Sequence, residues 1–265
     1  MIDYLSLTLQ LPPDKDYMEY YGNVTEDSFM SHIYKYMCEL DKSRILFCPH
    51  KFKEFTNARM PFTNIILNPK HFDCYEEMEV YIFSIMNSPE LNLEAINVSR
   101  IDVAADIEDI NVKAIIAMLH VKGIKAFRII NDTIYAGKNP KVRIYNKLAE
   151  IIYRIKKETK ITEGENILLK SYKELTRFEV AVSRPKLNLK QLKENPVRLA
   201  SYFDRLNFLK LSCSNPCGVM QIMYKQVNRK FRKQLEALRD MILLEKIKET
   251  YTSDVIQWFT EKEPF

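Results

Sequence analysis

Three short segments constrain the fold of this chain more than any other feature, because each alternates charged or phenolic side chains with apolar ones. They read Ser99-Arg-Ile-Asp-Val-Ala-Ala-Asp106, Lys141-Val-Arg-Ile-Tyr-Asn-Lys147 and Leu175-Thr-Arg-Phe-Glu-Val180. On a β-strand, residues two apart point to the same face. The alternation therefore predicts three strands, each with one polar face.

The polar faces of these strands together hold carboxylates, a tyrosine and several cations. The expected members are Arg100, Asp102 and Asp106 on the first strand, Arg143, Tyr145 and Lys147 on the second, and Arg177 and Glu179 on the third. If the strands pair, these groups converge on one surface. That set of groups fits a metal-assisted phosphoryl-transfer site with a tyrosine nucleophile.

The order Arg-Ile-Asp, Ile-Tyr-Asn-Lys and Arg-Phe-Glu resembles the rolling-circle replication initiators of plasmids, the Rep_trans or replication initiation factor family. It is also similar to mobile-element relaxases and filamentous-phage replication endonucleases. The resemblance covers roughly residues 95 to 183, with weaker support from the strand-like start of the chain. One motif alone is unspecific, whereas all three in this order at comparable spacing form a fairly specific signal.

Proteins of this family nick one DNA strand and stay joined to its 5′ phosphate through a tyrosine, with a divalent cation held by acidic residues. The resemblance implies that Tyr145 is the nucleophile and that Lys147 is the lysine that follows it. It also implies that Asp102 and Glu179 bind the metal, with Asp106 as a second carboxylate of the first motif. The implied fold is α+β, with a mainly antiparallel central sheet flanked by helices.

The chemistry of the predicted site follows from the residue types. A phenol has a pKa of about 10, and the cations Arg143 and Lys147 on the same face would favour its ionised form. The chain has no His-x-His pair, since its histidines are His32, His50, His71 and His120. A metal site would then be mostly carboxylate, which suits Mg²⁺ or Mn²⁺.

Structural alternatives exist for the same residues. A strand tyrosine is usually a packing residue, and Tyr153 is a rival nucleophile in a Tyr-x-x-Lys helix pattern. The carboxylates of the first and third motifs could instead form structural ion pairs with Arg100 or Arg177.

Charge is divided unevenly along the chain, although the net charge is only +5. Residues 1–110 hold 9 Lys and Arg against 19 Asp and Glu, whereas residues 111–265 hold 31 against 16. We expect the second part to attract a polyanion. A long helix predicted over 219–250 carries a basic cluster near its start, and we expect Arg229, Lys230 and Arg232 to bind DNA. A merely solvated face is the alternative for any such lysine-rich run.

Local patterns predict the remaining organisation. The sequence shows no clean domain boundary, and the resemblance implies an α+β nicking domain over 1–185, with a helical C-terminal region over 186–265. Pro185 is expected to end regular structure. The expected elements are strands at Ile2–Leu9 and 62–67, helices at 26–39, Tyr75–Met86, 112–120 and from Lys147, a hairpin of 126–130 with Thr133–Ala136, and short helices over 188–211.

The compartment is expected to be cytoplasmic and the protein soluble. The apolar runs are too short to cross a bilayer, and no signal-peptide pattern opens the chain. Five cysteines, an odd number, indicate free thiols in a reducing environment.

These observations predict a site-specific, metal-dependent DNA-nicking and strand-transfer protein that acts on single-stranded or hairpin DNA at a replication origin. A host helicase is a candidate partner, and a homodimer a candidate assembly. Two rivals remain: a DNA-binding copy-control or replication regulator with the same fold but no nicking activity, and an RNA-binding module.

Overall fold

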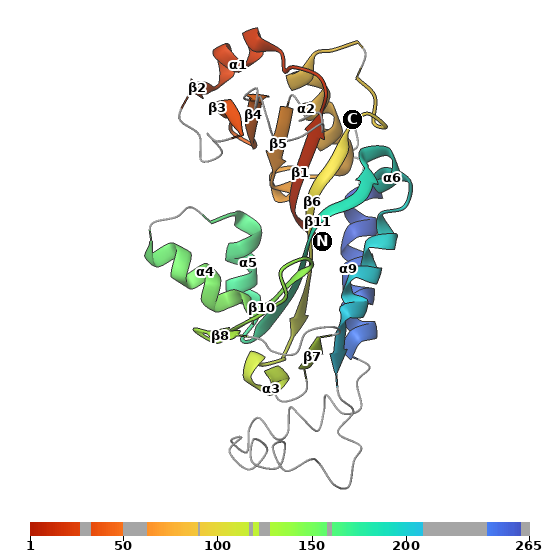
Figure 1. Cartoon of the computed structure of the whole chain (residues 1–265). Coiled ribbons are helices and arrows are strands. Elements are labelled where there is room, and N and C mark those ends of the chain that lie inside the picture. The colour runs from red at the N-terminus through yellow and green to blue at the C-terminus, as the bar shows by residue number, and fades with distance from the viewer. Residues whose placement is uncertain are drawn as a thin grey trace, which may run out of the picture. The chain divides into compact units, whose positions relative to one another are not determined.

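A computed structural model describes residues 1–26, 33–49, 63–89, 91–116, 119–121, 128–157, 161–208 and 243–260 (Figure 1). Its strands are β1 (Ile2–Leu9), β2 (Asn23–Thr25), β3 (Tyr34–Glu39), β4 (Ser43–Pro49), β5 (Thr63–Leu67), β6 (Asn97–Glu108), β7 (Leu119–Val121), β8 (Arg128–Ile130), β9 (Thr133–Ala136), β10 (Lys141–Asn146), β11 (Leu175–Asn188) and β12 (Leu206–Phe208). Its helices are α1 (Lys15–Tyr21), η1 (Pro69–His71), α2 (Tyr75–Met86), α3 (Val112–Ile116), α4 (Lys147–Lys156), α5 (Glu163–Ser171), α6 (Leu189–Glu194), η2 (Pro196–Arg205) and α9 (Leu243–Thr260).

The fold is mixed α+β with a large, mainly antiparallel sheet and a C-terminal helix, which confirms the predicted class. The chain forms two compact units, and neither is one continuous stretch. Unit 1 contains residues 1–102, 182–198 and 254–265, and unit 2 contains residues 103–181 and 199–253. The long strands β6 and β11 therefore contribute residues to both units.

Unit 1 is built on strands in the order β2-β3-β4-β5-β1, followed by the first part of β6 and the last part of β11. Alternation along β1 sends Leu5, Leu7 and Leu9 into the core, where each is at most 1% exposed. Helix α2 supplies apolar side chains to the same core. Its Tyr75 ring stacks on Phe259 with centroids 4.4 Å apart, so the end of α9 completes unit 1.

The opposite face of β1 in unit 1 is polar. The Ser6 hydroxyl donates to Asn64 Oδ1 on β5 at 3.0 Å and lies 2.7 Å from the Ser99 hydroxyl on β6. Thr8 lies directly across from Asn64 in the β1–β5 register. One face of this sheet thus presents hydroxyl and amide groups rather than a second apolar layer.

Unit 2 is built on the last part of β6, the first part of β11, and then β10, β9 and β8 in that order. Val142 and Ile144 of β10 are fully buried and lie opposite Val180 and Phe178 of β11. This apolar face leaves the alternate residues of both strands on the other face. The predicted alternation of the second and third motifs is confirmed.

Several predicted elements are confirmed at residue level. The strand Ile2–Leu9, the helix Tyr75–Met86 and the helix that begins at Lys147 lie where expected. The hairpin turns at Asn131-Asp132, and both residues have positive φ, 49° and 58°. Residues 126 and 127 of that prediction lie outside the described residues.

Two helix predictions are wrong in part. Residues Tyr34–Glu39 form strand β3, paired on both sides by β2 and β4, where a helix over 26–39 was expected. The helix expected over 112–120 ends at Ile116 in the described chain, and Leu119–Val121 pairs with Leu206–Phe208 as a strand. In both cases pairing with a partner strand overrides the local apolar spacing.

Pro185 does not end regular structure, because β11 continues to Asn188. The chain adapts around this proline, and its neighbours Arg184 and Lys186 both take positive φ, 53° and 54°. Short helices follow over 189–205, as predicted. The helix predicted over 219–250 falls mostly outside the described residues, and α9 runs on to Thr260.

The predicted domain boundary at residue 185 lies within β11, and that division of function stays a prediction. Among the described helices, none combines the length and the apolar character that spanning a membrane requires. Cys38, Cys48 and Cys74 are free, as predicted, and the other two cysteines lie outside the described residues.

Candidate active site

Tyr145 and Glu179 meet on the polar face of unit 2. The register places Arg143 opposite Glu179 and Tyr145 opposite Arg177, so all four side chains share one face of β10 and β11. The Tyr145 hydroxyl donates a hydrogen bond to Glu179 Oε2 at 3.5 Å. Arg143 Nε donates to the other oxygen, Oε1, at 2.8 Å. A phenol, a carboxylate and a guanidinium thus form one hydrogen-bonded group.

The exposure of these side chains shows where a ligand could reach them. Glu179 has 2% of its side chain exposed and Arg143 has 36%. Tyr145 is half-buried, and the Arg143 guanidinium lies 5.6 Å from the centre of its ring. A ligand approaching from solvent would therefore meet Arg143 and Tyr145 first, with Glu179 beneath them.

The same face extends along a row of paired residues to the edge of the sheet. Arg143 lies opposite Tyr135 on β9, and Tyr135 lies opposite Arg128 on β8. Lys141 places its ammonium 5.6 Å from the Tyr135 ring. Arg128 and Lys141 are exposed. Cations alternate with tyrosines along this row, an arrangement that can contact both phosphates and bases.

Asp106 and Arg177 form a second pair on unit 2. Arg177 is 1% exposed and donates from Nε and Nη2 to the two oxygens of Asp106, at 2.7 and 2.5 Å. A two-pronged pair of this kind fixes both side chains. The buried guanidinium needs this carboxylate, because an unpaired charge in the interior is costly.

Asp102 lies in unit 1, whereas Asp106 and Glu179 lie in unit 2. Its two oxygens accept from Arg100 Nε and Nη2 at 2.8 and 2.6 Å. Asp102 is 3% exposed. Arg100 also stacks on Tyr4, with its guanidinium 4.6 Å from the ring centre.

The three predicted metal ligands, Asp102, Asp106 and Glu179, thus share one feature. Each is held by an arginine through both of its oxygens. Their donor chemistry suits Mg²⁺ or Mn²⁺, but each carboxylate is already neutralised by its arginine, with which a cation would have to compete. In the part of the chain that the structure describes, no three acidic, histidine or cysteine side chains are grouped to hold a metal. As arranged, the donor set does not fit a metal.

Lys147 lies on a helix rather than on the strand face of Tyr145. It is the first residue of α4, whose N-cap is Asn146, and it is 3% exposed. Its ammonium contacts Glu150 at 2.7 Å and Glu165 at 3.6 Å. The expectation that Lys147 shares the face of Arg143 is therefore wrong, since the strand ends one residue earlier.

Glu165 ties α5 to α4 through this network. Burial alone would raise the pKa of Glu165, but the Thr162 amide, the Arg154 side chain and the charge of Lys147 bring that pKa below its ordinary value. Arg154 also contacts Glu150, at 2.6 Å. Two cations and two carboxylates therefore join the helix that follows Tyr145 to its neighbour.

Arg128 and Tyr135 belong to this surface but were not among the predicted site residues. They could have been predicted, because a two-residue turn at Asn131-Asp132 fixes which residues of the hairpin lie opposite each other. The rival nucleophile Tyr153 is 62% exposed on α4. The predicted DNA contacts Arg229, Lys230 and Arg232 lie outside the described residues.

Comparison with known proteins adds no relative to this picture. Neither the protein-family models nor the curated proteins contain a match to the chain.

Proposed function

We propose that unit 2 carries a tyrosine-dependent DNA-nicking and strand-transfer site, and that the protein initiates rolling-circle replication of a plasmid or phage, or mobilises an integrated element. The observation that carries the proposal is the hydrogen bond from the Tyr145 hydroxyl to Glu179, with Arg143 bound to the same carboxylate. The second and third of the motifs that resemble the initiator family supply these residues.

The proposed reaction transfers one phosphodiester bond. Tyr145 Oη attacks the phosphorus, and its proton passes to Glu179. The bond to the 3′ oxygen breaks, and that oxygen takes a proton from solvent. The 5′ phosphate remains on the tyrosine, so a later 3′ hydroxyl can reverse the step and rejoin the strand. Arg143, which is partly exposed, is placed to neutralise the non-bridging phosphate oxygens.

The proposed substrate is single-stranded or hairpin DNA, because the tyrosine must reach a backbone that is not enclosed in a regular duplex. The row of Arg128, Tyr135, Arg143 and Lys141 supports a strand lying across β8 to β10. Cations on such a surface bind the backbone, and aromatic rings accept unstacked bases.

We also propose a divalent cation, Mg²⁺ or Mn²⁺, as the cofactor of this reaction. For a cation to bind, Glu179 must release Arg143 or Asp106 must release Arg177. A DNA phosphate that draws Arg143 away would free the Glu179 oxygens.

A covalent adduct is the decisive measurement. Labelled hairpin DNA incubated with the protein and Mn²⁺ should give a protein–DNA adduct that maps to Tyr145. Tyr145→Phe should abolish the adduct and leave DNA binding almost unchanged, because one hydroxyl is lost from an otherwise intact basic surface. Tyr153→Phe is the matched control and should react as the parent does. A DNA-linked peptide containing Tyr153 would overturn the assignment.

A second candidate function is a DNA-binding regulator without nicking activity. The pairing of all three predicted metal ligands with arginines favours it, since this is how structural ion pairs are satisfied. Origin binding without any adduct, with or without Mn²⁺, would support the regulator. A matched RNA hairpin that binds more tightly than the DNA would contradict both candidates.

A further inference from the structure

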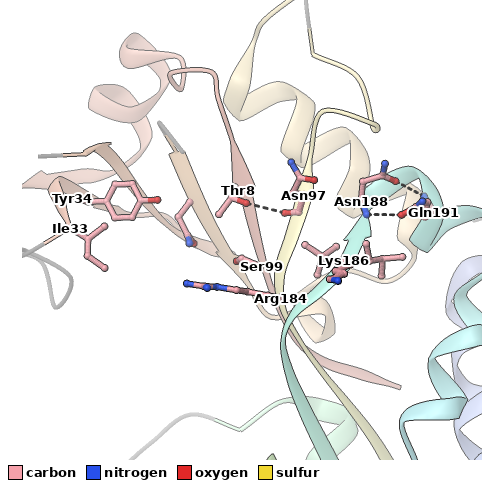
Figure 2. Close-up of a pocket in the computed structure, with 12 residues that line it drawn as sticks. Thr8, Ile33, Tyr34, Asn97, Ser99, Arg184, Lys186, Asn188 and Gln191 are labelled. Carbon is pink, nitrogen blue, oxygen red and sulfur yellow. Dashed lines mark hydrogen bonds between the residues drawn. The ribbon is translucent and has the colours of Figure 1, made fainter. Parts of the chain in front are cut away.

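A groove of about 520 Å³ lies within unit 1, and none of the described residues that line it belongs to the candidate active site (Figure 2). Strands β1, β5 and β6 form its floor, and the last part of β11 forms one wall. Its polar lining comes chiefly from Thr8, Asn64, Ser99, Tyr34, Arg184 and Lys186. The volume is in the range of pockets that hold small organic ligands.

The floor presents a mixture of fixed and available polar atoms. The Asn64 side-chain oxygen accepts from Ser6, which fixes the amide, and its nitrogen makes no hydrogen bond to any described residue. Thr8 donates to the Asn97 carbonyl, at 3.4 Å. Asn188 and Gln191 also line the groove, but they bond to each other's backbone as the cap of α6, as the dashed lines show (Figure 2).

Tyr34 supplies a buried hydroxyl to the groove. The residue is 2% exposed, and within the described residues its hydroxyl makes no hydrogen bond. Figure 2 shows this hydroxyl pointing into the groove, toward the strand that carries Thr8. A buried hydroxyl is normally paired. This one is available to a polar group of a ligand.

Arg184 and Lys186 add positive charge to one wall. Both are exposed, and neither forms an ion pair with any residue that the structure describes. Both have φ near 53°, a left-handed conformation that is unfavourable for residues other than glycine. Strained backbone of this kind is concentrated at sites of function. Here it places two cations beside one groove.

We propose that this groove binds a nucleotide, with its phosphate on Arg184 and Lys186 and its base against Tyr34 and Asn64. The two cations suit a phosphate, whereas an uncharged ligand would leave them unused. The Tyr34 hydroxyl and the Asn64 amide suit the edge of a base, which carries donors and acceptors in one plane. The nucleotide is either free or one unit of a single strand.

The test is titration of the whole protein with dAMP, with inorganic phosphate and with the trinucleotide dApdApdA, followed by NMR or calorimetry. We expect dAMP to bind more tightly than phosphate. Arg184→Gln with Lys186→Gln should weaken both about 10-fold or more, because charge-assisted hydrogen bonds are lost. Tyr34→Phe should weaken the binding of dAMP about 2- to 10-fold and leave the binding of phosphate unchanged.

Matched controls separate a built site from general electrostatics. Lys138→Gln with Lys170→Gln removes the same charge from exposed positions of unit 2 and should leave dAMP binding unchanged. Equal loss in both double variants, or equal affinity for dAMP and phosphate, would overturn the proposal. Circular dichroism and thermal unfolding identify a variant that fails to fold, and in that case Arg184→Lys with Lys186→Arg should retain binding.

The trinucleotide distinguishes the two sources of the ligand. Binding about 10-fold tighter than dAMP assigns the groove to a strand, since each added phosphate contact contributes. Equal binding assigns it to a free nucleotide. Tyr145→Phe should bind dAMP as the parent does, so failure of this proposal is distinct from failure of the nicking reaction.

Discussion

The metal-binding role predicted for Asp106 conflicts with the ion pair that this residue forms in the structure. As a metal ligand it must offer free lone pairs, but here both oxygens bind the buried Arg177. The structure therefore favours a stabilising role in the state that it describes. The two roles make opposite predictions for the same substitution.

Asp106→Asn should lower the free energy of unfolding by about 2–4 kcal/mol, because it removes the negative charge that binds the buried Arg177 guanidinium through two hydrogen bonds. Urea denaturation measures this change. Asp109→Asn removes the same charge from an exposed position at the end of the strand, and it should change stability by less than about 0.5 kcal/mol. Unchanged stability of Asp106→Asn together with lost Mn²⁺-dependent nicking would instead assign Asp106 to the metal.

Lys147→Met should lower the free energy of unfolding by about 1–3 kcal/mol, because Glu150 and Glu165 then share only Arg154. Activity per folded molecule should remain. Thermal unfolding combined with the adduct assay measures both quantities. The control is Lys156→Met, at an exposed position of the same helix. If folded Lys147→Met forms no adduct, the catalytic role implied by the family resemblance is correct.

At the scale of elements, the β8–β9 hairpin carries Arg128 and Tyr135, the outer members of the row of cations and tyrosines that begins at Arg143. Its turn residues Asn131 and Asp132 both have positive φ, the geometry of a type I′ turn, in which glycine usually takes the second place. Asp132 also contacts Lys113 at 3.3 Å, but both side chains are more than half exposed, so this pair contributes little.

Asp132→Gly should stabilise the protein by roughly 0.5 kcal/mol, because glycine adopts this conformation without steric cost. Asp132→Ala should destabilise it by about 1 kcal/mol, because alanine pays that steric cost without the local hydrogen bonding of an aspartate. Both variants lose the same carboxylate, so their difference reports the backbone alone. Thermal unfolding measures it. Equal stability of the two variants would show that the left-handed backbone at residue 132 does not limit stability.

Local pattern was sufficient for some elements and insufficient for others, for physical reasons. Helix α2 and strand β1 carry their own apolar periodicity, and both lie where the sequence predicts. Strand β3 is stabilised by β2 and β4, and β7 by β12 about 85 residues away. The β7–β12 pairing leaves no local trace in the sequence, whereas β3 and β4 are neighbours in a hairpin that the helical spacing over 26–39 concealed.

For the candidate site, the sequence predicts which residues share a strand face but not which side chains pair. Alternation alone places Tyr145 and Arg143 on one face of their strand. The partner of each carboxylate depends on strand register, which the motifs do not specify. The alternative of arginine–carboxylate ion pairs was correct for Asp102, which pairs with Arg100, but it did not include Arg143, which binds Glu179.

At the scale of the molecule, the charge division predicts how DNA affinity responds to salt. Neutralising Arg229, Lys230 and Arg232 together should weaken binding to all sequences alike. It should flatten the dependence of log K on log salt by up to about 0.9 per lost phosphate contact on duplex, and less on single strands. Titrations at several salt concentrations measure the slope. An unchanged slope would show that the DNA path lies elsewhere.

The discontinuity of the two units has a consequence for biosynthesis. Unit 1 contains β1 to β5 and α2, but it also contains the end of α9, where Phe259 stacks on Tyr75 of α2. The Tyr75 ring therefore gains this partner only after synthesis has reached Phe259. A nascent chain that has not yet reached α9 leaves the Tyr75 ring without this cover, and apolar surface exposed in this way is what chaperones bind.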